Sequence, residues 1–313
     1  MHHAEVVAHR VGEPLGTVLL ALAVTVIEVG LIVSLMLSGG EATAALARDT
    51  VFASIMIILN GMVGLCLLVG ALRHGEQSFS LYGVNATLAT LATIAIITLV
   101  LPNATTSIPG PSYSISQLTF VAAAAIVLYG AFVAVQTVRK RDYFLPPADL
   151  AEHAADGAMP PSTVTARLGA ILLIVCLAAV ILLAKTLASA IETAVDSVRA
   201  PRAIVGVVIA MIVLLPESIA ALNAARRNRP QTSLNLALGS AMASIGLTIP
   251  AVAAVSIATG WPLILGLDTK GSLLLGLSLL VATLSLGTGK TIGLQGIVHL
   301  VLFATYLFTT IVP

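Results

Sequence analysis

The chain has 313 residues, of which 58% are hydrophobic and only 9% are charged, and its mean hydropathy is +1.06. Soluble domains carry about 25% charged residues, so this composition excludes a soluble globular protein and indicates an integral membrane protein built from helices. The formal net charge of +1 argues against a nucleic-acid partner.

Nine apolar runs follow one another along the chain, and each is long enough to cross a bilayer as a helix. A spanning helix needs about 20 apolar residues, and it satisfies its own backbone hydrogen bonds in lipid. We therefore predict an all-α, polytopic membrane protein with about nine transmembrane helices. The runs are Gly16–Leu37, Val51–Leu72, Leu81–Leu101, Gln117–Val138, Arg167–Leu187, Ala203–Ala225, Ser233–Ala258, Ser272–Leu286 and Ile292–Val312.

A polar interval near the middle separates these runs into two groups. It contains Arg139-Lys140-Arg141, Pro146-Pro147 and Pro160-Pro161, a composition typical of an exposed linker. We expect a linker over 139–166, between a first repeat at 1–138 and a second repeat at 167–313. If the linker is cytoplasmic, ten Lys and Arg lie on the cytoplasmic side and five on the other, which favours an N-terminus inside and a C-terminus outside.

Two carboxylates lie deep within the apolar runs. Glu28 is inside the first run, and Glu217 follows the apolar stretch Ala203–Leu215. A carboxylate at that depth costs about 2.5–3.5 kcal/mol on insertion scales, so such residues face a bundle interior or a wet cavity. We expect both glutamates to be ion or proton ligands that face each other across a shared cavity.

The surroundings of Glu217 strengthen this expectation. Pro216 removes a helix hydrogen bond, so we expect the helix to be broken beside the carboxylate. The next run opens with small or polar residues, which allow close helix contact and offer oxygen atoms to an ion. We expect Gly239 to have no room for a side chain and Ser240 to lie at ligand depth. The whole set is Asn235, Gly239, Ser240, Ser244 and Thr248.

The two groups of runs repeat the same pattern. The segment after Glu28 reads RDTVFASIM from Arg48, and the segment after Glu217 reads LNLALGSAM from Leu234, so that Ser54 corresponds to Ser240. Ala53 precedes Ser54, whereas Gly239 precedes Ser240. Because glycine permits the closest helix contact, we expect more crowding at Gly239 than at Ala53. By the charge argument the two glutamate helices run in opposite directions. Inverted repeats place ion sites at their interface near the midplane.

At these residues the chain resembles the cation/calcium exchanger superfamily, and within it the bacterial calcium(sodium, potassium)/proton antiporters. The resemblance implies that each half supplies one glutamate to a central site that binds cation and protons in turn. It implies these roles for Glu28 and Glu217, with Ser54, Gly239 and Ser240 on the small-residue helices beside them. The matching stretches are Ala8–Gly16, Val26–Val29, Arg48–Phe52, Leu215–Ser218, Asn235–Ser240 and Ala304–Leu307.

Two features depart from the family pattern. Its calcium/proton exchangers usually carry Gly-Asn-Ala before each glutamate, whereas this chain has Thr25-Val-Ile and Leu214-Leu-Pro, which leaves the choice among Ca²⁺, Na⁺ and K⁺ open. The family also has more helices, and this chain begins at what resembles the end of the second. We therefore expect the first repeat to lack its N-terminal helices, through a lost segment or a start assigned too late.

Four further polar residues lie on or near the expected ion path. Asn60 and Asn235 could supply carbonyl oxygens, but interhelical hydrogen bonding explains either equally well. Asp49, near a helix end, fits a solvated or capping residue better than a ligand. His299, in the middle of the last run, fits either a hydrogen-bonded packing residue or part of a proton path.

Together these features predict a secondary active transporter, not an enzyme, that exports Ca²⁺, or alternatively Na⁺ or K⁺, in exchange for protons by alternating access. Its expected partners are the cation, protons and the lipid bilayer, with no cofactor, and the resemblance implies the bacterial inner membrane. A passive cation channel is an alternative. An intramembrane enzyme is a weaker one, because the sequence has no evident Ser-His pair, paired Asp or His-rich metal motif. The oligomeric state is left open.

Overall fold

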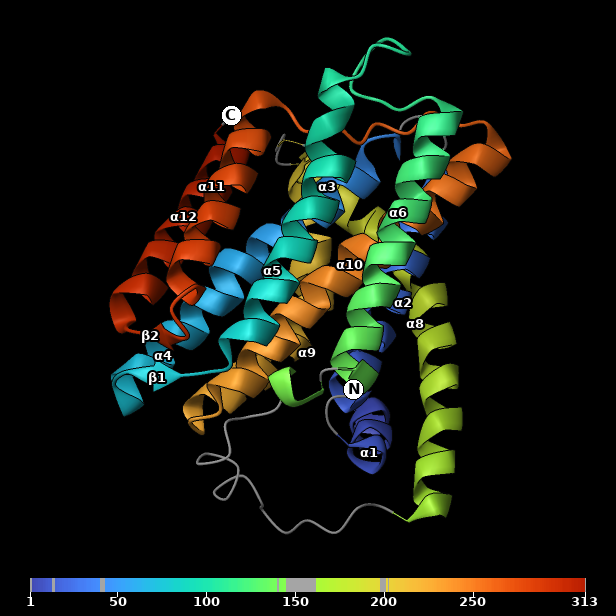
Figure 1. Cartoon of the computed structure of the whole chain (residues 1–313). Helices are drawn as coiled ribbons and strands as arrows, with labels where there is room; N and C mark the ends of the chain where they lie inside the picture. Colours follow the sequence, from blue (N-terminus) through green and yellow to red (C-terminus); the bar gives the residue numbers. More distant parts are fainter. Residues whose placement is uncertain are drawn as a thin grey trace.

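The structure, a computed structural model, describes residues 2–12, 15–39, 43–139, 141–144, 162–197, 201 and 203–312. Over these ranges the chain forms a bundle of long helices with one two-stranded sheet (Figure 1). In chain order the elements are α1 (His2–Val11), α2 (Leu15–Gly39), α3 (Leu46–Met56), η2 (Ile57–Met62), α4 (Val63–His74), β1 (Gln77–Ser78), α5 (Leu81–Ala95), η3 (Ile96–Val100), η4 (Leu101–Ala104), α6 (Ile115–Ala134), η5 (Val135–Arg139), η6 (Arg141–Phe144), α8 (Thr163–Ser197), α9 (Ala203–Arg226), α10 (Pro230–Thr259), α11 (Thr269–Leu286), β2 (Lys290–Thr291) and α12 (Gly293–Ile311).

Seven helical stretches in the described ranges are long and apolar enough to cross a membrane. Two shorter apolar stretches, Thr25–Met36 and Thr163–Cys176, lie within α2 and α8. The prediction of an all-helical membrane protein with about nine spans is therefore confirmed. The seven stretches are Leu46–His74, Leu81–Ala104, Ile115–Arg139, Ala203–Arg226, Pro230–Thr259, Thr269–Leu286 and Gly293–Ile311.

Some helix ends differ from the predicted ones. α6 begins at Ile115 rather than Gln117, because Ser114 and Gln117 form a capping box that fixes the first turn. α8 extends past both ends of the predicted span, since its polar ends continue the helix beyond the apolar run. α1 is an additional helix in a stretch that is too polar to be predicted as a span.

α10 is the central helix of the bundle, and it packs against α2, α3, α5, α6 and α9 (Figure 1). Small residues let its neighbours approach: a Cβ added at Gly246 would lie 2.9 Å from the Cβ of Tyr129 on α6. Its serines Ser240 and Ser244 are buried. The packing therefore places hydroxyl groups in the centre of the bundle, away from lipid.

α12 and α4 are in direct backbone contact. A Cβ added at Gly64 on α4 would lie 2.8 Å from the Cβ of His299, and one added at Gly296 on α12 would lie 2.6 Å from the backbone nitrogen of Leu68. Glycine at both positions lets the two helices touch without intervening side chains. The contact holds the fully buried His299 close to η2.

The helix backbones are irregular at places that the sequence does not indicate. η2, η3 and η5 are π-helical. Conversely, α9 runs without interruption through Pro216, so the predicted break beside Glu217 is wrong. Proline lacks only its own N–H, and packed neighbours allow membrane helices to continue past it.

The sheet joins the two halves of the chain at the end of the bundle from which the 139–166 linker leaves (Figure 1). β1 and β2 are antiparallel, with Gln77 opposite Thr291 and Ser78 opposite Lys290. Lys290 also forms a 2.8 Å salt bridge with Glu76, and this carboxylate raises the pKa of the lysine. The end of α4 is thereby tied to the start of α12.

The start of the predicted linker is partly buried, although Arg139 and Tyr143 are exposed. η6 turns back against the helices, and Phe144 is only 2% exposed. The aromatic ring carries enough apolar surface to dock this end, so the expectation of an exposed linker is wrong at Phe144. Residues 145–161, with both proline pairs, lie outside the described residues.

Candidate ion-binding site

Both predicted glutamates are buried inside the bundle. Glu28 on α2 is 1% exposed and Glu217 on α9 is 2% exposed. Within the described residues, neither carboxyl group has a salt-bridge partner. An isolated charge in an apolar interior is strongly unfavourable, so these carboxyl groups need protons, a cation or both to neutralise them.

Three serine hydroxyls contact the two carboxyl groups. Ser54 on α3 donates a 3.1 Å hydrogen bond to Oε1 of Glu28, and Ser244 on α10 donates a 2.7 Å bond to the same oxygen. Ser240 on α10 donates a 2.6 Å bond to Oε2 of Glu217. The sequence predicted Ser54 and Ser240 beside the glutamates, and each lies against the glutamate of its own half.

Ser240 and Ser244 bring the two glutamates to one helix face. Residues four apart on a helix lie about 5–6 Å from each other at Cβ. Glu217 and Glu28, which bond to these serines, therefore lie beside adjacent turns of α10. Carboxylate and hydroxyl oxygens are the ligands that hard cations prefer. The arrangement can hold a cation when the carboxyl groups are ionised, or protons when they are neutral.

The role of Ser244 was not assigned from the sequence, which grouped it only with the small residues of its helix. Its contact is with the glutamate of the other half, 216 positions away. The four-residue spacing from Ser240 was the available signal. This spacing places the two serines on one face of the helix. It does not show that both glutamates pack against that face.

The expected crowding at Gly239 is wrong. A Cβ added there would have no atom within 4 Å apart from its own chain neighbours and helix backbone. Gly239 instead lines a void of about 10 Å³ between α10 and α6. By contrast, Ala53, which precedes Ser54, is fully buried. The crowding is therefore greater at the alanine, because α3 lies deep in the core.

Asn60 and His299 meet in a second buried polar cluster. The Asn60 amide donates a 2.8 Å hydrogen bond to the Ser278 hydroxyl on α11, and its Oδ1 lies 3.3 Å from Nδ1 of His299 on α12. All three side chains are 0% exposed. The cluster joins η2 to α11 and α12, and its member Asn60 lies on the same continuous helix as Ser54.

Asn235 lies nearer the linker than the serines do. Its amide donates a 2.6 Å hydrogen bond to the backbone carbonyl of Phe144, and its Oδ1 accepts a 2.9 Å bond from Gln231. The amide therefore fixes the start of the linker to α10. The structure does not bring Asn235 to either glutamate, as the separation of Asn235 from Ser240 along the helix axis dictates.

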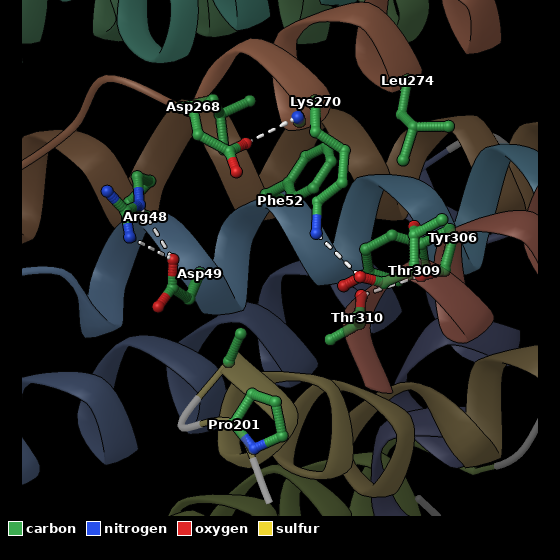
Figure 2. A pocket seen from close by; sticks show the side chains of 13 residues that line it. Arg48, Asp49, Phe52, Pro201, Asp268, Lys270, Leu274, Tyr306, Thr309 and Thr310 are labelled. Atoms are coloured by element: carbon green, nitrogen blue, oxygen red, sulfur yellow. Dashed lines mark hydrogen bonds and ion pairs between the residues drawn. The ribbon is translucent and has the colours of Figure 1, made fainter. Parts of the chain in front are cut away.

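Asp49 lines a pocket of about 210 Å³ at the other end of the bundle. Figure 2 shows it facing Arg48, with which it forms a 2.8 Å salt bridge. Across the pocket, Lys270 donates a hydrogen bond to the carbonyl of Thr309, and Asp268 caps the first turn of α11 by accepting from Gly271 N–H. Asp49 is thus partly buried and paired, rather than freely solvated.

Comparison with known proteins agrees with this geometry. The family described as sodium/calcium exchanger protein matches residues 1–138 and 168–312. The chain is 50% identical over 313 residues to the y4hA protein of Sinorhizobium fredii (strain NBRC 101917 / NGR234), covering 100% of this chain and 84% of the relative. It is 38% identical over 313 residues to the sodium-potassium/proton antiporter ChaA of Escherichia coli (strain K12), covering 99% and 84%.

Solved structures share the fold at lower identity. Native YfkE superposes with a TM-score of 0.74 at 17% identity, over 100% of this chain and 87% of that one. The H⁺/Ca²⁺ exchanger CAX superposes with a TM-score of 0.73 at 18% identity, over 98% and 78%. With the match of the family over both halves, the protein belongs to the sodium/calcium exchanger family of membrane cation exchangers.

Proposed function

We propose that the protein is a cation/proton antiporter whose single central site is formed by Glu28 and Glu217. The observation that carries the proposal is the pair of buried carboxyl groups, each bonded to a serine on an adjacent turn of α10. One site of this kind can be occupied by a cation or by protons, but not fully by both, and this competition couples the two fluxes.

The proposed ligands are the oxygen atoms of the two glutamates and of Ser54, Ser240 and Ser244. Gly239 contributes space rather than an oxygen. The names of related proteins support proton-coupled exchange: ChaA is a sodium-potassium/proton antiporter and CAX an H⁺/Ca²⁺ exchanger. We propose Ca²⁺ as the exported cation, with Na⁺ or K⁺ as the alternative cargo, because two carboxylates can balance one divalent charge.

The proposed mechanism is alternating access. When the site is open to the outside, protons neutralise Glu28 and Glu217. When it opens to the cytoplasm, a cation displaces these protons, and a proton gradient thereby drives cation export. The chain supplies the carboxyl groups that take up and release the protons, while the serine hydroxyls orient those groups and remain bonded to them in either state.

We also propose that the protein acts in the bacterial inner membrane, with the 139–166 linker in the cytoplasm and the repeats at 1–138 and 167–313 on either side of it. The excess of Lys and Arg on the linker side supports this orientation. The bacterial sources of the two curated relatives support the location.

The test is cation-induced proton movement in proteoliposomes that contain the purified protein and a pH-sensitive dye. Ca²⁺, Na⁺ and K⁺ are added separately, with an imposed pH gradient and without one. An antiporter moves protons in the direction opposite to the cation. It accumulates the cation while the imposed pH gradient dissipates. Cation flux that is unaffected by the pH gradient and moves no protons would identify a channel instead.

A further inference from the structure

A small void lies beside Gly239, at the contact of α10 with α6 and α2. Its volume is about 10 Å³, and its lining includes Tyr129, Gln136, Asn235 and Gly239. A cavity of about 10–15 Å³ is large enough for one water molecule. Ser240, whose hydroxyl binds Glu217, is the next residue along α10. The void therefore lies at the same level of α10 as Ser240, on the helix face that carries Asn235 and Gly239.

Gln136 gives this void a polar wall. The side chain is 2% exposed, and its Oε1 has no hydrogen-bond partner in the part of the chain that the structure describes. A buried acceptor of this kind normally bonds to protein or to an ordered water. Gln136 also belongs to the π-helical segment η5, and π-helical turns occur frequently at functional sites. The unpaired acceptor points to a hydrated position.

The start of the linker packs directly behind the wall of the void. The ring of Phe144 meets that of Phe132 edge to face, with centroids 6.0 Å apart. The backbone carbonyl of Phe144 accepts a 2.6 Å hydrogen bond from Asn235. Phe132 and Asn235 both line the void, so Phe144 supports two of its walls.

The residue before Phe144 is held by a third helix. The ring of Tyr143 stacks on that of Tyr82 with centroids 5.2 Å apart. The carbonyl oxygen of Tyr143 lies so close to Gly83 on α5 that an added Cβ would collide with it. The start of the linker is thus fixed to α5, α6 and α10 together, and a shift of α6 relative to α10 has to disturb these contacts.

We propose that the void is a water-binding position on the path between the Ser240–Glu217 site and the linker side of the membrane. Phe144 is the plug that closes this path. Gln136 holds the water through Oε1, and this water hydrates the cation or proton that passes. What passes through the void rests on the proposed function. The closure by Phe144 can be measured without any transport.

The closure is tested by thiol labelling of the full-length protein in proteoliposomes. Cys66 and Cys176 are replaced by serine and Gly239 by cysteine, and the rate of reaction with a small cationic methanethiosulfonate is measured from the linker side. We expect slow labelling that becomes about tenfold faster when Phe144→Ala removes the plug. An Arg227→Cys thiol, in an exposed turn at the same end, provides the control and should label at one rate in both backgrounds.

A second variant covers the case in which Phe144→Ala fails to fold. Gly83→Ala pushes the carbonyl of Tyr143 away from α5 while leaving Phe144 unchanged, so it should also speed labelling at position 239. Gly130→Ala on α6 is the matched control, because a Cβ added there meets no atom within 4 Å. Unchanged labelling in every folded plug variant would overturn the closure.

The path is tested by filling the void. Gly239→Ala should slow exchange about tenfold while leaving the protein as thermostable as before or more so, because alanine is the better helix former. Gly276→Ala on α11, also with no atom within 4 Å of the new Cβ, should exchange at the wild-type rate. Gln136→Leu should slow exchange as Gly239→Ala does. Normal exchange by both void variants would show that the void is not on the path.

The two failures are distinguishable. If the wild-type protein moves no cation, the proposed function fails, whereas the labelling rates still decide whether Phe144 closes the void. If the wild-type protein exchanges and the plug variants label no faster, the closure alone fails.

Discussion

Ser244 on α10 donates a 2.7 Å hydrogen bond to Glu28 on α2, although the two residues are 216 positions apart in the chain. The bond links the second half of the protein to the acid of the first. Glu217 has its own bond from Ser240, one turn away on the same helix. A movement of α10 therefore changes the surroundings of both carboxyl groups at once.

The first prediction concerns the glutamates. Glu28→Gln or Glu217→Gln should abolish proton-coupled exchange, because an amide keeps the shape and cannot cycle a charge. Insertion and folding should persist, since a neutral group is easier to bury than a carboxylate. Proton release on cation addition, with membrane abundance, measures both. Glu76→Gln, at an exposed salt bridge, is the control and should exchange normally. Exchange by either site variant would remove that glutamate from the mechanism.

The second prediction concerns the serines. Ser240→Ala and Ser244→Ala should each weaken apparent cation affinity roughly fivefold, the equivalent of about 1 kcal/mol for one hydroxyl contact. Ser54→Ala should have a smaller effect, because its bond to Glu28 is longer, at 3.1 Å. Initial exchange rates over a range of cation concentrations give the affinities. Ser256→Ala on the same helix, whose hydroxyl bonds to the Trp261 carbonyl, should leave affinity unchanged. Equal affinities in all four variants would contradict a ligand role.

The third prediction concerns the Asn60 cluster. Asn60→Leu should destabilise the protein by about 1–3 kcal/mol, because it removes the Asn60 bonds to His299 and to Ser278, although the Ser278 hydroxyl still donates to the Leu274 carbonyl. His299→Leu should cost less in the Asn60→Leu background than in the wild type, as expected for residues in one network. Thermal unfolding in detergent measures the three variants. Loss of exchange at unchanged stability would instead place the cluster on the proton path.

The fourth prediction reverses the expectation drawn from the repeat. Ala53→Leu should lower folded yield and thermal stability more than Gly239→Leu, because Ala53 is fully buried and Gly239 opens on a void. Overpacking a filled core costs about 1–3 kcal/mol. Fluorescence-detected size exclusion after heating compares the two. A less stable Gly239→Leu would restore the original expectation of crowding at that glycine.

The fifth prediction concerns the contact of α4 with α12. Gly296→Ala should destabilise the protein, because its Cβ would lie 2.6 Å from the backbone of Leu68, which cannot retreat as a flexible side chain can. The matched Gly276→Ala has open space and should be neutral or stabilising. The melting temperatures of the two variants are the measurement. A shift of the same sign in both would argue against backbone contact at Gly296.

The sequence predicted the fold and the acids because both depend on burial in lipid. Spans follow from unbroken apolar runs, and Glu28 and Glu217 stand out because a carboxylate inside such a run is costly. Ser54 and Ser240 followed from the repeat of short motifs. In these cases a local pattern was sufficient to locate the residue.

The remainder depends on contacts between distant segments. Gly239 and Ala53 occupy matching positions in the repeats, and only their neighbours decide which is crowded. Phe144 looked like part of a polar linker because its single ring is outweighed by charged and proline residues nearby. The π-helical η2 is held by Ser278 and His299 from the end of the chain. None of these contacts leaves a periodic signal in the sequence.

The strands β1 and β2 have a consequence for how the protein can move. They clamp the end of α4 to the start of α12, and the same two helices touch through Gly64 and Gly296 farther along. Two contacts at different points along one helix pair oppose sliding of the helices past each other. We therefore expect α4 and α12 to move as one unit, so that under the proposed alternating access the exposure of Glu28 and Glu217 changes through movement of the other helices against this pair.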